Sequence, residues 1–141
     1  MKPGAIQPQP LNAFYFHPPF SDNYFPDILD EIYKKQVYKR FLPNKTTGTV
    51  CLDIGANVGL SVYYFSQHFE KVIAVEPAKQ HLESLTTMTK TNNLSNVTVV
   101  PYAVSNNNGR TKFYHNPNQT AFTLSENSKN DKFEEVETIT I

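Results

Sequence analysis

The stretch VCLDIGANVG, residues 50–59, decides the fold class of this 141-residue chain. Its first half, 50–54, is a short apolar run that predicts a buried parallel strand. Its second half has glycines at Gly55 and Gly59 and an asparagine at Asn57, the residue types that best tolerate positive φ. A strand that turns sharply into a helix leaves backbone N–H groups at the helix start without partners. The stretch therefore predicts a turn at which a ligand can approach the backbone closely.

Helices and strands alternate after this turn. The expected elements are a helix over 60–69, a strand over 71–75, a helix over 79–90, and strands over 97–100, 110–114 and 136–141. The polar segment 115–132 has no clear period. The alternation predicts an α/β fold of the Rossmann-like kind, with a mostly parallel sheet and helical crossovers.

The N-terminal part of the chain has a different composition. Residues 1–26 hold six of the ten prolines together with several aromatic residues, and this density of proline forbids regular helix. We expect an extended arm that lies across a surface of its own domain or of a partner. Residues 27–141 are predicted to form the N-terminal part of a Rossmann-like domain. They begin with an amphipathic helix, because apolar residues recur every fourth position from Leu29 to Phe41, and Pro43 ends it.

Two carboxylates accompany the turn. Asp53 ends the first predicted strand and Glu76 follows the second. In nucleotide-binding βαβ units an acidic residue at the latter position hydrogen-bonds the ribose hydroxyls. The dinucleotide pattern G-x-G-x-x-G lacks its middle glycine here, where Asn57 stands, and Asp53 would repel a pyrophosphate. These residues favour S-adenosylmethionine, which carries an amino group and a sulfonium, over NAD. An NAD-binding, dehydrogenase-like domain stays an alternative.

The same residues resemble the class I S-adenosylmethionine-dependent methyltransferases and, more narrowly, the FkbM-type methyltransferases. The family pattern has D-x-G-A-N-x-G, an apolar strand ending in Glu-Pro, Asn-Asn-Leu before a Val-rich strand, and Ala-Val-Ser before a glycine-containing turn. All four pieces occur in this order within residues 48–114. The resemblance implies S-adenosylmethionine as cofactor and methyl transfer to an oxygen. The acceptor, a small molecule or a glycan or lipid, is not identified by the sequence.

The resemblance also implies the cofactor-binding residues. They are Asp53, Gly55, Asn57, Gly59, Glu76, Pro77, Tyr102 and Ala103. The first four would line the methionine and ribose side, Glu76 would hold the ribose hydroxyls, and the last two would lie against adenine. No catalytic residue is predicted.

The sequence departs from the family at its C-terminal side. In the family, a strand in the central sheet beside the first strand commonly carries an acidic stretch of the Lys-Ile-Asp-Val-Glu-Gly kind, and further strands and helices follow. This sequence ends at Ile141 without them, so we expect a domain truncated at the C-terminal side, with one side of strand 50–54 uncovered. A fragment, a truncated gene product, or a chain whose sheet is completed by an oligomer or a partner would all fit. A truncated cofactor- or partner-binding domain without catalysis is a further alternative.

Composition narrows the function classes. Thirteen basic residues balance thirteen acidic ones, so no nucleic acid partner is expected. The sequence has no apolar run of about 18 residues that would predict a membrane span, and no signal-peptide pattern. A single cysteine is compatible with the reducing cytosol, which favours a cytoplasmic location. Cys51 is expected to be a small buried strand residue rather than a nucleophile.

The histidines do not predict a metal site. They are scattered along the chain, without metal-ligand spacing or a cysteine cluster, at His17, His68, His81 and His115. Tyr114, His115 and Glu126 lie where an acceptor could make contacts, and we expect them to be surface loop residues.

Overall fold

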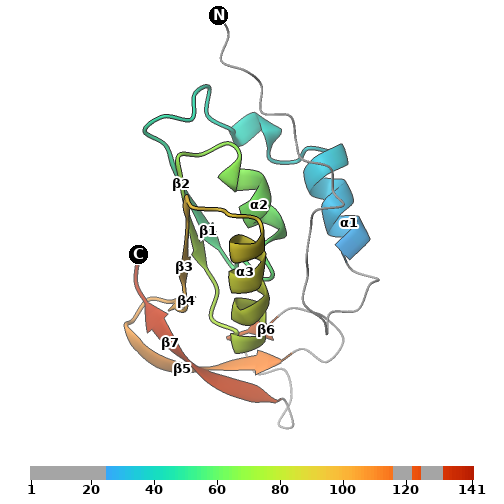
Figure 1. Cartoon of the computed structure of the whole chain (residues 1–141). Coiled ribbons are helices and arrows are strands. Elements are labelled where there is room, and N and C mark those ends of the chain that lie inside the picture. The colour runs from blue at the N-terminus through green and yellow to red at the C-terminus, as the bar shows by residue number, and fades with distance from the viewer. Residues whose placement is uncertain (1–24, 116–121, 125–131) are drawn as a thin grey trace, which may run out of the picture.

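The computed structural model describes residues 25–115, 122–124 and 132–141. Their elements, in chain order, are α1 (Phe25–Leu29), the π-helix η2 (Asp30–Lys34), the 3₁₀ turn η3 (Lys39–Phe41), β1 (Val50–Ile54), α2 (Leu60–Ser66), β2 (Lys71–Val75), α3 (Lys79–Thr91), β3 (Val97–Val100), β4 (Ala103–Val104), β5 (Gly109–His115), β6 (Phe122–Thr123) and β7 (Phe133–Ile139). They form two sheets, with α2 and α3 packed beside the first one (Figure 1).

The first sheet is parallel and has the order β1-β2-β3. Its three strands begin and end where the sequence predicts them, and helices α2 and α3 connect them. The predicted βαβαβ alternation is thus confirmed, and the chain has a mixed α/β fold with a mainly parallel sheet. Because parallel strands share one direction, the residues that follow β1, β2 and β3 meet at the carboxyl end of the sheet.

One face of this sheet is covered by the helices (Figure 1). Val72 and Ala74 of β2 are fully buried there, against Leu85 and Met88 of α3. Cys51 of β1 packs against the same cluster and is half-buried. This apolar layer is the main core, and it packs the two helices against the sheet.

The other face of β1 is open among the described residues. Val50, Leu52 and Ile54 alternate along the strand and expose 60%, 43% and 52% of their surface. The prediction of a buried strand is therefore wrong for these three residues. The physical reason is that both crossover helices lie on one face of the sheet. The expected uncovered side of strand 50–54 is observed, because β1 is the outer strand of this sheet and has no neighbour on one side among the described residues.

The second sheet has the order β4-β7-β5-β6. Strands β5 and β7 pair antiparallel along most of their length and correspond to the two strands predicted over 110–114 and 136–141. The two-residue strands β4 and β6 are too short to leave a period in the sequence, and they were not predicted. The polar segment 115–132 lies mostly outside the described residues.

The helix predicted from residue 27 to Pro43 is wrong in its extent. Its first half is α1 and η2, after which Gln36 takes a positive φ of 52° and ends the helix. The 3₁₀ turn η3 follows, and Val37 and Phe41 are 43% and 67% exposed. The apolar period continues there, but neither residue belongs to an apolar cluster of the described residues, and the Arg40 guanidinium lies 4.6 Å from the centre of the Phe41 ring.

The helical N-terminal segment nevertheless has a packing role. Ile32 is buried in a second apolar cluster with Val58, Leu60 and Tyr64, and the rings of Tyr33 and Tyr64 meet edge to face at 5.5 Å. The segment thus packs against the turn after β1 and the start of α2. The predicted division at residue 26 stays a prediction, since residues 1–24 lie outside the described part. Within that part, no helix is long and apolar enough to cross a membrane.

Candidate functional site

The turn after β1, residues 55–59, is called here the glycine loop. The N–H groups of Gly55 and Ala56 both donate to the carbonyl oxygen of Val75, at 2.9 and 3.0 Å, and tie the loop to the end of β2. Gly55, Asn57 and Gly59 have φ values of 77°, 52° and 98°. The predicted need for positive φ at these three positions is confirmed, and the loop leads directly into α2.

The two glycines of this loop have different surroundings. A Cβ atom on Gly59 would lie 2.3 Å from Met88 Cε and 2.8 Å from Leu85 Cδ1, so α3 packs directly on this glycine. A Cβ atom on Gly55 would meet nothing within 4 Å. Gly59 is therefore required for the packing of the protein itself, whereas Gly55 leaves open space in front of the backbone.

Glu76 is hydrogen-bonded to the glycine loop and to the residue before α3. Its side chain is buried, with the residue only 4% exposed. One carboxylate oxygen, Oε2, accepts from the N–H of Asn57 at 2.8 Å, and Oε1 accepts from the N–H of Ala78 at 2.8 Å. His81 Nδ1 lies 3.4 Å from Oε1. The carboxylate thus joins the glycine loop to the start of α3; its predicted contact with ribose hydroxyls stays a prediction.

Asp53 lies on the other side of the loop and is half-buried. The hydroxyl of Ser61 donates to its Oδ2 at 2.6 Å. Burial raises the pKa of the Asp53 carboxyl, the Ser61 hydrogen bond lowers it, and the nearby charge of Glu76 raises it again, with a net rise. Burial and then the Asp53 charge raise the pKa of Cys51 to about 11, which fits the expected unreactive strand cysteine.

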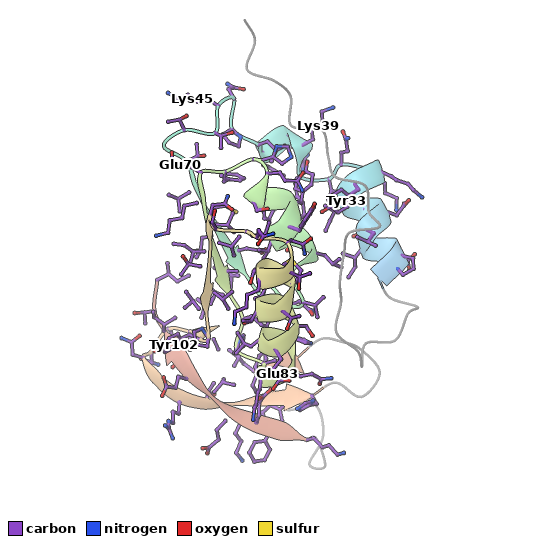
Figure 2. All side chains as sticks on the ribbon, in the orientation of Figure 1. Tyr33, Lys39, Lys45, Glu70, Glu83 and Tyr102 are labelled. Carbon is purple, nitrogen blue, oxygen red and sulfur yellow. The ribbon has the colours of Figure 1, made fainter. Side chains whose placement is uncertain are left out.

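An apolar pocket of about 180 Å³ opens at the same edge of the sheet. It is lined by Ile54, Gly55, Val75, Pro77, Tyr102, Ala103, Val104, Phe113 and Leu124. Four of the predicted cofactor-binding residues are therefore brought together around it, at the end of the molecule where Tyr102 is labelled in Figure 2. Pockets that enclose a whole small molecule start at roughly 300 Å³, so this one accommodates a part of a ligand, such as a flat ring.

The other four predicted residues do not line this pocket. Asn57 and Gly59 form the second half of the glycine loop, Asp53 precedes the loop in β1, and Glu76 is hydrogen-bonded to the loop at Asn57. Asn57 has its N–H turned to Glu76 rather than to open space. The site therefore has a pocket side and a loop-supporting side.

Sequence reasoning missed three side chains that touch this site. Ser61 and His81 each lie in the first turn of the helix after a predicted carboxylate, and this spacing is a signal that could have identified them. Phe113 reaches the pocket from β5, and only the fold reveals that it does.

The segment considered for acceptor contacts gives a mixed result. Tyr114 is buried, 9% exposed, within β5 and so is not a surface loop residue. His115 ends β5, where its N–H donates to the carbonyl oxygen of Lys132 at 2.7 Å. Glu126 and His17 lie outside the described residues. No group of three or more metal-ligating side chains occurs in the part of the chain that the structure describes.

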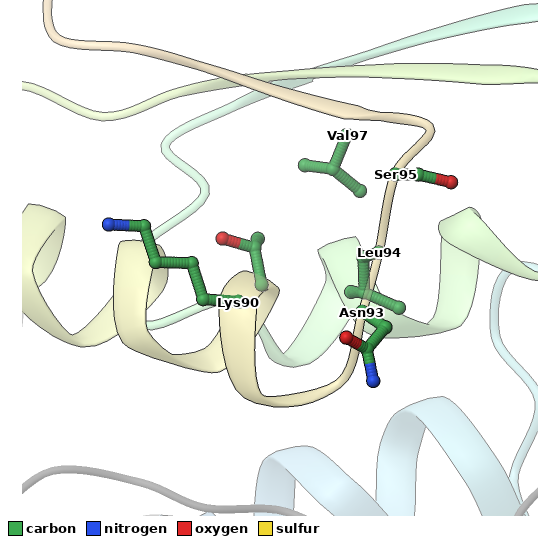
Figure 3. Close-up of a pocket in the computed structure, with 6 residues that line it drawn as sticks. Lys90, Asn93, Leu94, Ser95 and Val97 are labelled. Carbon is green, nitrogen blue, oxygen red and sulfur yellow. The ribbon is translucent and has the colours of Figure 1, made fainter.

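A second hollow, of about 360 Å³, lies at the opposite end of α3 (Figure 3). It is lined by Thr89, Lys90, Asn93, Leu94, Ser95 and Val97. It adjoins the amino end of β3, whereas ligands of open parallel sheets bind beyond the carboxyl ends of the strands. The carboxyl-end pocket beside the glycine loop is therefore the better candidate site.

Comparison with known proteins finds similarity to solved structures at low sequence identity. No protein-family model matches the sequence, and no curated protein matches it either. Similar solved structures include methyltransferase FkbM from Methylobacillus flagellatus KT, with 16% identity, a TM-score of 0.42, and coverage of 84% of this chain and 33% of that one. They also include the YcgJ protein from Bacillus subtilis, with 21% identity, a TM-score of 0.40 and coverage of 53% and 29%.

A third similar structure is the precorrin 8W decarboxylase from Methanobacterium thermoautotrophicum, with 15% identity, a TM-score of 0.41 and coverage of 63% of this chain and 45% of that one. This chain spans less than half the length of each of the three. At these identities the likeness concerns the fold alone. The three-stranded parallel sheet with its two crossover helices is itself a Rossmann-like α/β arrangement.

Proposed function

We propose that the carboxyl-end site binds S-adenosylmethionine and that the chain serves methyl transfer to an oxygen of an acceptor, a small molecule or a glycan or lipid. One observation carries the proposal. Gly55, where a side chain would meet nothing within 4 Å, lines an apolar pocket together with Tyr102 and Phe113, and the Asp53 carboxylate comes from the same end of β1, two residues earlier. An anionic group beside an apolar pocket suits a cationic ligand with a flat aromatic part.

The residues present fit this cofactor in kind. The pocket accommodates a flat base between apolar and aromatic side chains. Gly55 lets the rest of a ligand approach the backbone, because it has no side chain there. The Asp53 carboxylate attracts the ammonium and sulfonium charges, and its surroundings are unfavourable to a pyrophosphate. This charge preference supports S-adenosylmethionine over NAD.

The chemistry divides between the cofactor and the protein. When bound, S-adenosylmethionine supplies a methyl group activated by its sulfonium. The protein's part is to hold the cation beside Asp53, to exclude water with the apolar lining, and to orient the methyl group in line with the acceptor. Removal of a proton from an oxygen acceptor is not assigned to a residue.

Isothermal titration calorimetry tests the proposal. The wild-type chain is expected to bind S-adenosylmethionine in preference to NAD. Asp53→Asn keeps an oxygen for Ser61 but removes the charge, and should weaken S-adenosylmethionine binding by about tenfold or more, since a hydrogen bond or contact to a charged group is worth about 1.5–3 kcal/mol. Glu83→Gln, which removes an exposed carboxylate on α3, is the matched control and should leave the affinity unchanged.

Glu76→Ala is a second variant of the same experiment. It should weaken cofactor binding by about 1–3 kcal/mol, through loss of a charge-assisted hydrogen bond. Unchanged affinity would contradict the assignment of Glu76 to the ribose. Binding of NAD without S-adenosylmethionine would replace the proposal by a dehydrogenase-like domain. If neither ligand bound, the proposal would fail.

A further inference from the structure

Glu76 and His81 form a buried pair behind the glycine loop. The two residues are 4% and 2% exposed, and His81 Nδ1 lies 3.4 Å from Glu76 Oε1. Glu76 directly follows β2, and His81 lies in the first turn of α3. The pair therefore spans the junction between strand and helix at the edge of the sheet where the candidate site lies.

The Glu76 carboxylate accepts a hydrogen bond from the Asn57 N–H, which lies 19 residues earlier in the sequence. Asn57 is not a glycine and yet has a φ of 52°. A non-glycine residue costs free energy in that region, and it stays there only where its surroundings hold it. The hydrogen bond from Asn57 N–H to Oε2 is such a constraint, so the position of the carboxylate affects the shape of the loop.

A buried carboxylate needs compensation from several directions. Ala78 N–H donates to Oε1 at 2.8 Å, and His81 Nδ1 approaches the same oxygen. Both contacts hold Oε1 on the α3 side, which leaves Oε2 directed at the loop. Ala78 N–H is a hydrogen-bond donor to this buried carboxylate and His81 Nδ1 lies within ion-pair distance of it, so loss of either contact carries a penalty larger than the mean value of a hydrogen bond.

We propose that His81 is a positioning residue of the candidate site. It fixes the Glu76 carboxylate, and through it the Asn57 amide and the glycine loop. The consequence for ligand affinity rests on the proposed function, whereas the consequence for the loop does not. His81 itself does not line the apolar pocket.

Amide hydrogen exchange in the ligand-free protein tests the effect on the loop. His81→Leu removes the ring nitrogen and keeps an apolar side chain, whereas His81→Asn keeps an amide donor close to the position of Nδ1. We expect the Asn57 amide to exchange about tenfold faster in His81→Leu and within about threefold of wild type in His81→Asn. The Gly55 and Ala56 amides, which donate to Val75, should keep their exchange rates and show that the fold is intact.

Gln80→Leu is the matched control, because it makes the same substitution at an exposed neighbouring position of α3. It should leave Asn57 exchange unchanged. If Asn57 exchange is the same in His81→Leu as in wild type, the proposal is overturned. If all three loop amides exchange faster together in both His81 variants, His81 has a general packing role and the proposal is likewise overturned.

S-adenosylmethionine titration then tests the effect on the site. His81→Leu should weaken binding about tenfold, and His81→Asn should restore most of it. On a Glu76→Gln background the same His81→Leu change should have little further effect, because the two residues act on the loop in series. A full additional tenfold loss on that background would refute the series arrangement.

The two proposals fail in distinguishable ways. A wild-type chain that does not bind S-adenosylmethionine refutes the proposed function, and the exchange experiment still decides the role of His81. A chain that binds the cofactor but shows Asn57 exchange unaffected by His81→Leu refutes the role of His81 alone.

Discussion

The two halves of residues 53–59, the end of β1 and the glycine loop, differ in the contacts that hold them. At the first half, Gly55 faces open space and Asp53 is held by one hydroxyl, that of Ser61. At the second half, Gly59 lies against α3 and Asn57 is hydrogen-bonded to the buried Glu76. A single stretch of sequence therefore contains an open half, residues 53–55, and a locked half, residues 57–59.

This difference separates binding from support. Residues of the locked half make their contacts within the protein, and changing them should first affect stability. At the open half, the space at Gly55 would let a ligand approach the backbone and Asp53 would supply a charge, so changes there should first affect affinity. The motif as a whole is then a ligand-facing edge built on a rigid base, as expected for a preorganised site.

Gly59→Ala tests the locked half and has the largest expected effect. The added Cβ would lie 2.3 Å from Met88 Cε at a φ of 98°, so both packing and backbone are strained. We expect a loss of about 3 kcal/mol in the free energy of unfolding, from overpacking and the left-handed backbone together. Urea denaturation followed by circular dichroism measures it.

Gly55→Ala is the paired variant in the open half. Its φ of 77° is also positive, but its Cβ meets nothing within 4 Å, so only the backbone cost of about 1 kcal/mol applies. The comparison between the two halves is refuted if both alanine variants lose the same stability. Met88→Ala, which removes the clashing atoms, should reduce the additional loss in the free energy of unfolding caused by Gly59→Ala.

The strands of the parallel sheet could be predicted from sequence because each is a short apolar run between polar residues. The same logic failed for the segment after residue 34. A period of four apolar positions continues to Phe41, but Gln36 ends the helix with a positive φ and Phe41 belongs to no apolar cluster of the described residues. Periodicity reports which positions are apolar, and it does not report whether a partner surface exists.

The candidate site shows the same limit at closer range. Sequence spacing identified the need for glycine at positions 55 and 59, but it could not assign them different tasks. That distinction depends on where Leu85 and Met88 lie in space. Likewise, the position of His81 in the first turn of the helix after Glu76 indicates that the two residues could lie close, but the contact itself depends on how α3 packs at the end of β2.

Asp53→Asn tests the open half through pH. The folded-state pKa of Asp53 lies above its ordinary value of 3.8, chiefly because of burial. The favourable contribution of the protonated form is therefore complete below pH 3.8 and is lost as the pH rises through the raised folded pKa. At pH 7 the ionised carboxylate is less favourable in the folded than in the unfolded chain, so Asp53→Asn should raise the free energy of unfolding.

Denaturation curves at a series of pH values between 3 and 7 measure this gain, which should vanish toward the acid end. Glu83→Gln, with its carboxylate exposed on α3, is the control and should show no such gain. Together with the weaker cofactor binding proposed for Asp53→Asn, a gain in stability would identify a charge kept for function at a cost in stability. Lower stability of Asp53→Asn at pH 7 would contradict the comparison.

The Asp53 charge should also be detectable at Cys51, with the smallest of these effects. The pKa of Cys51 is about 11, raised from 9.0 first by burial and then by the charge of Asp53. Because the thiolate is the reactive form, the folded chain should react with a thiol reagent at pH 8 far more slowly than the unfolded chain. Removing only the second cause, in Asp53→Asn, should accelerate the reaction by a few fold, since burial remains. A rate close to that of the unfolded chain would mean that the variant exposes Cys51. An unchanged rate would mean that Asp53 carries no charge in the folded protein at that pH. Either result would remove the electrostatic distinction between the open and the locked half.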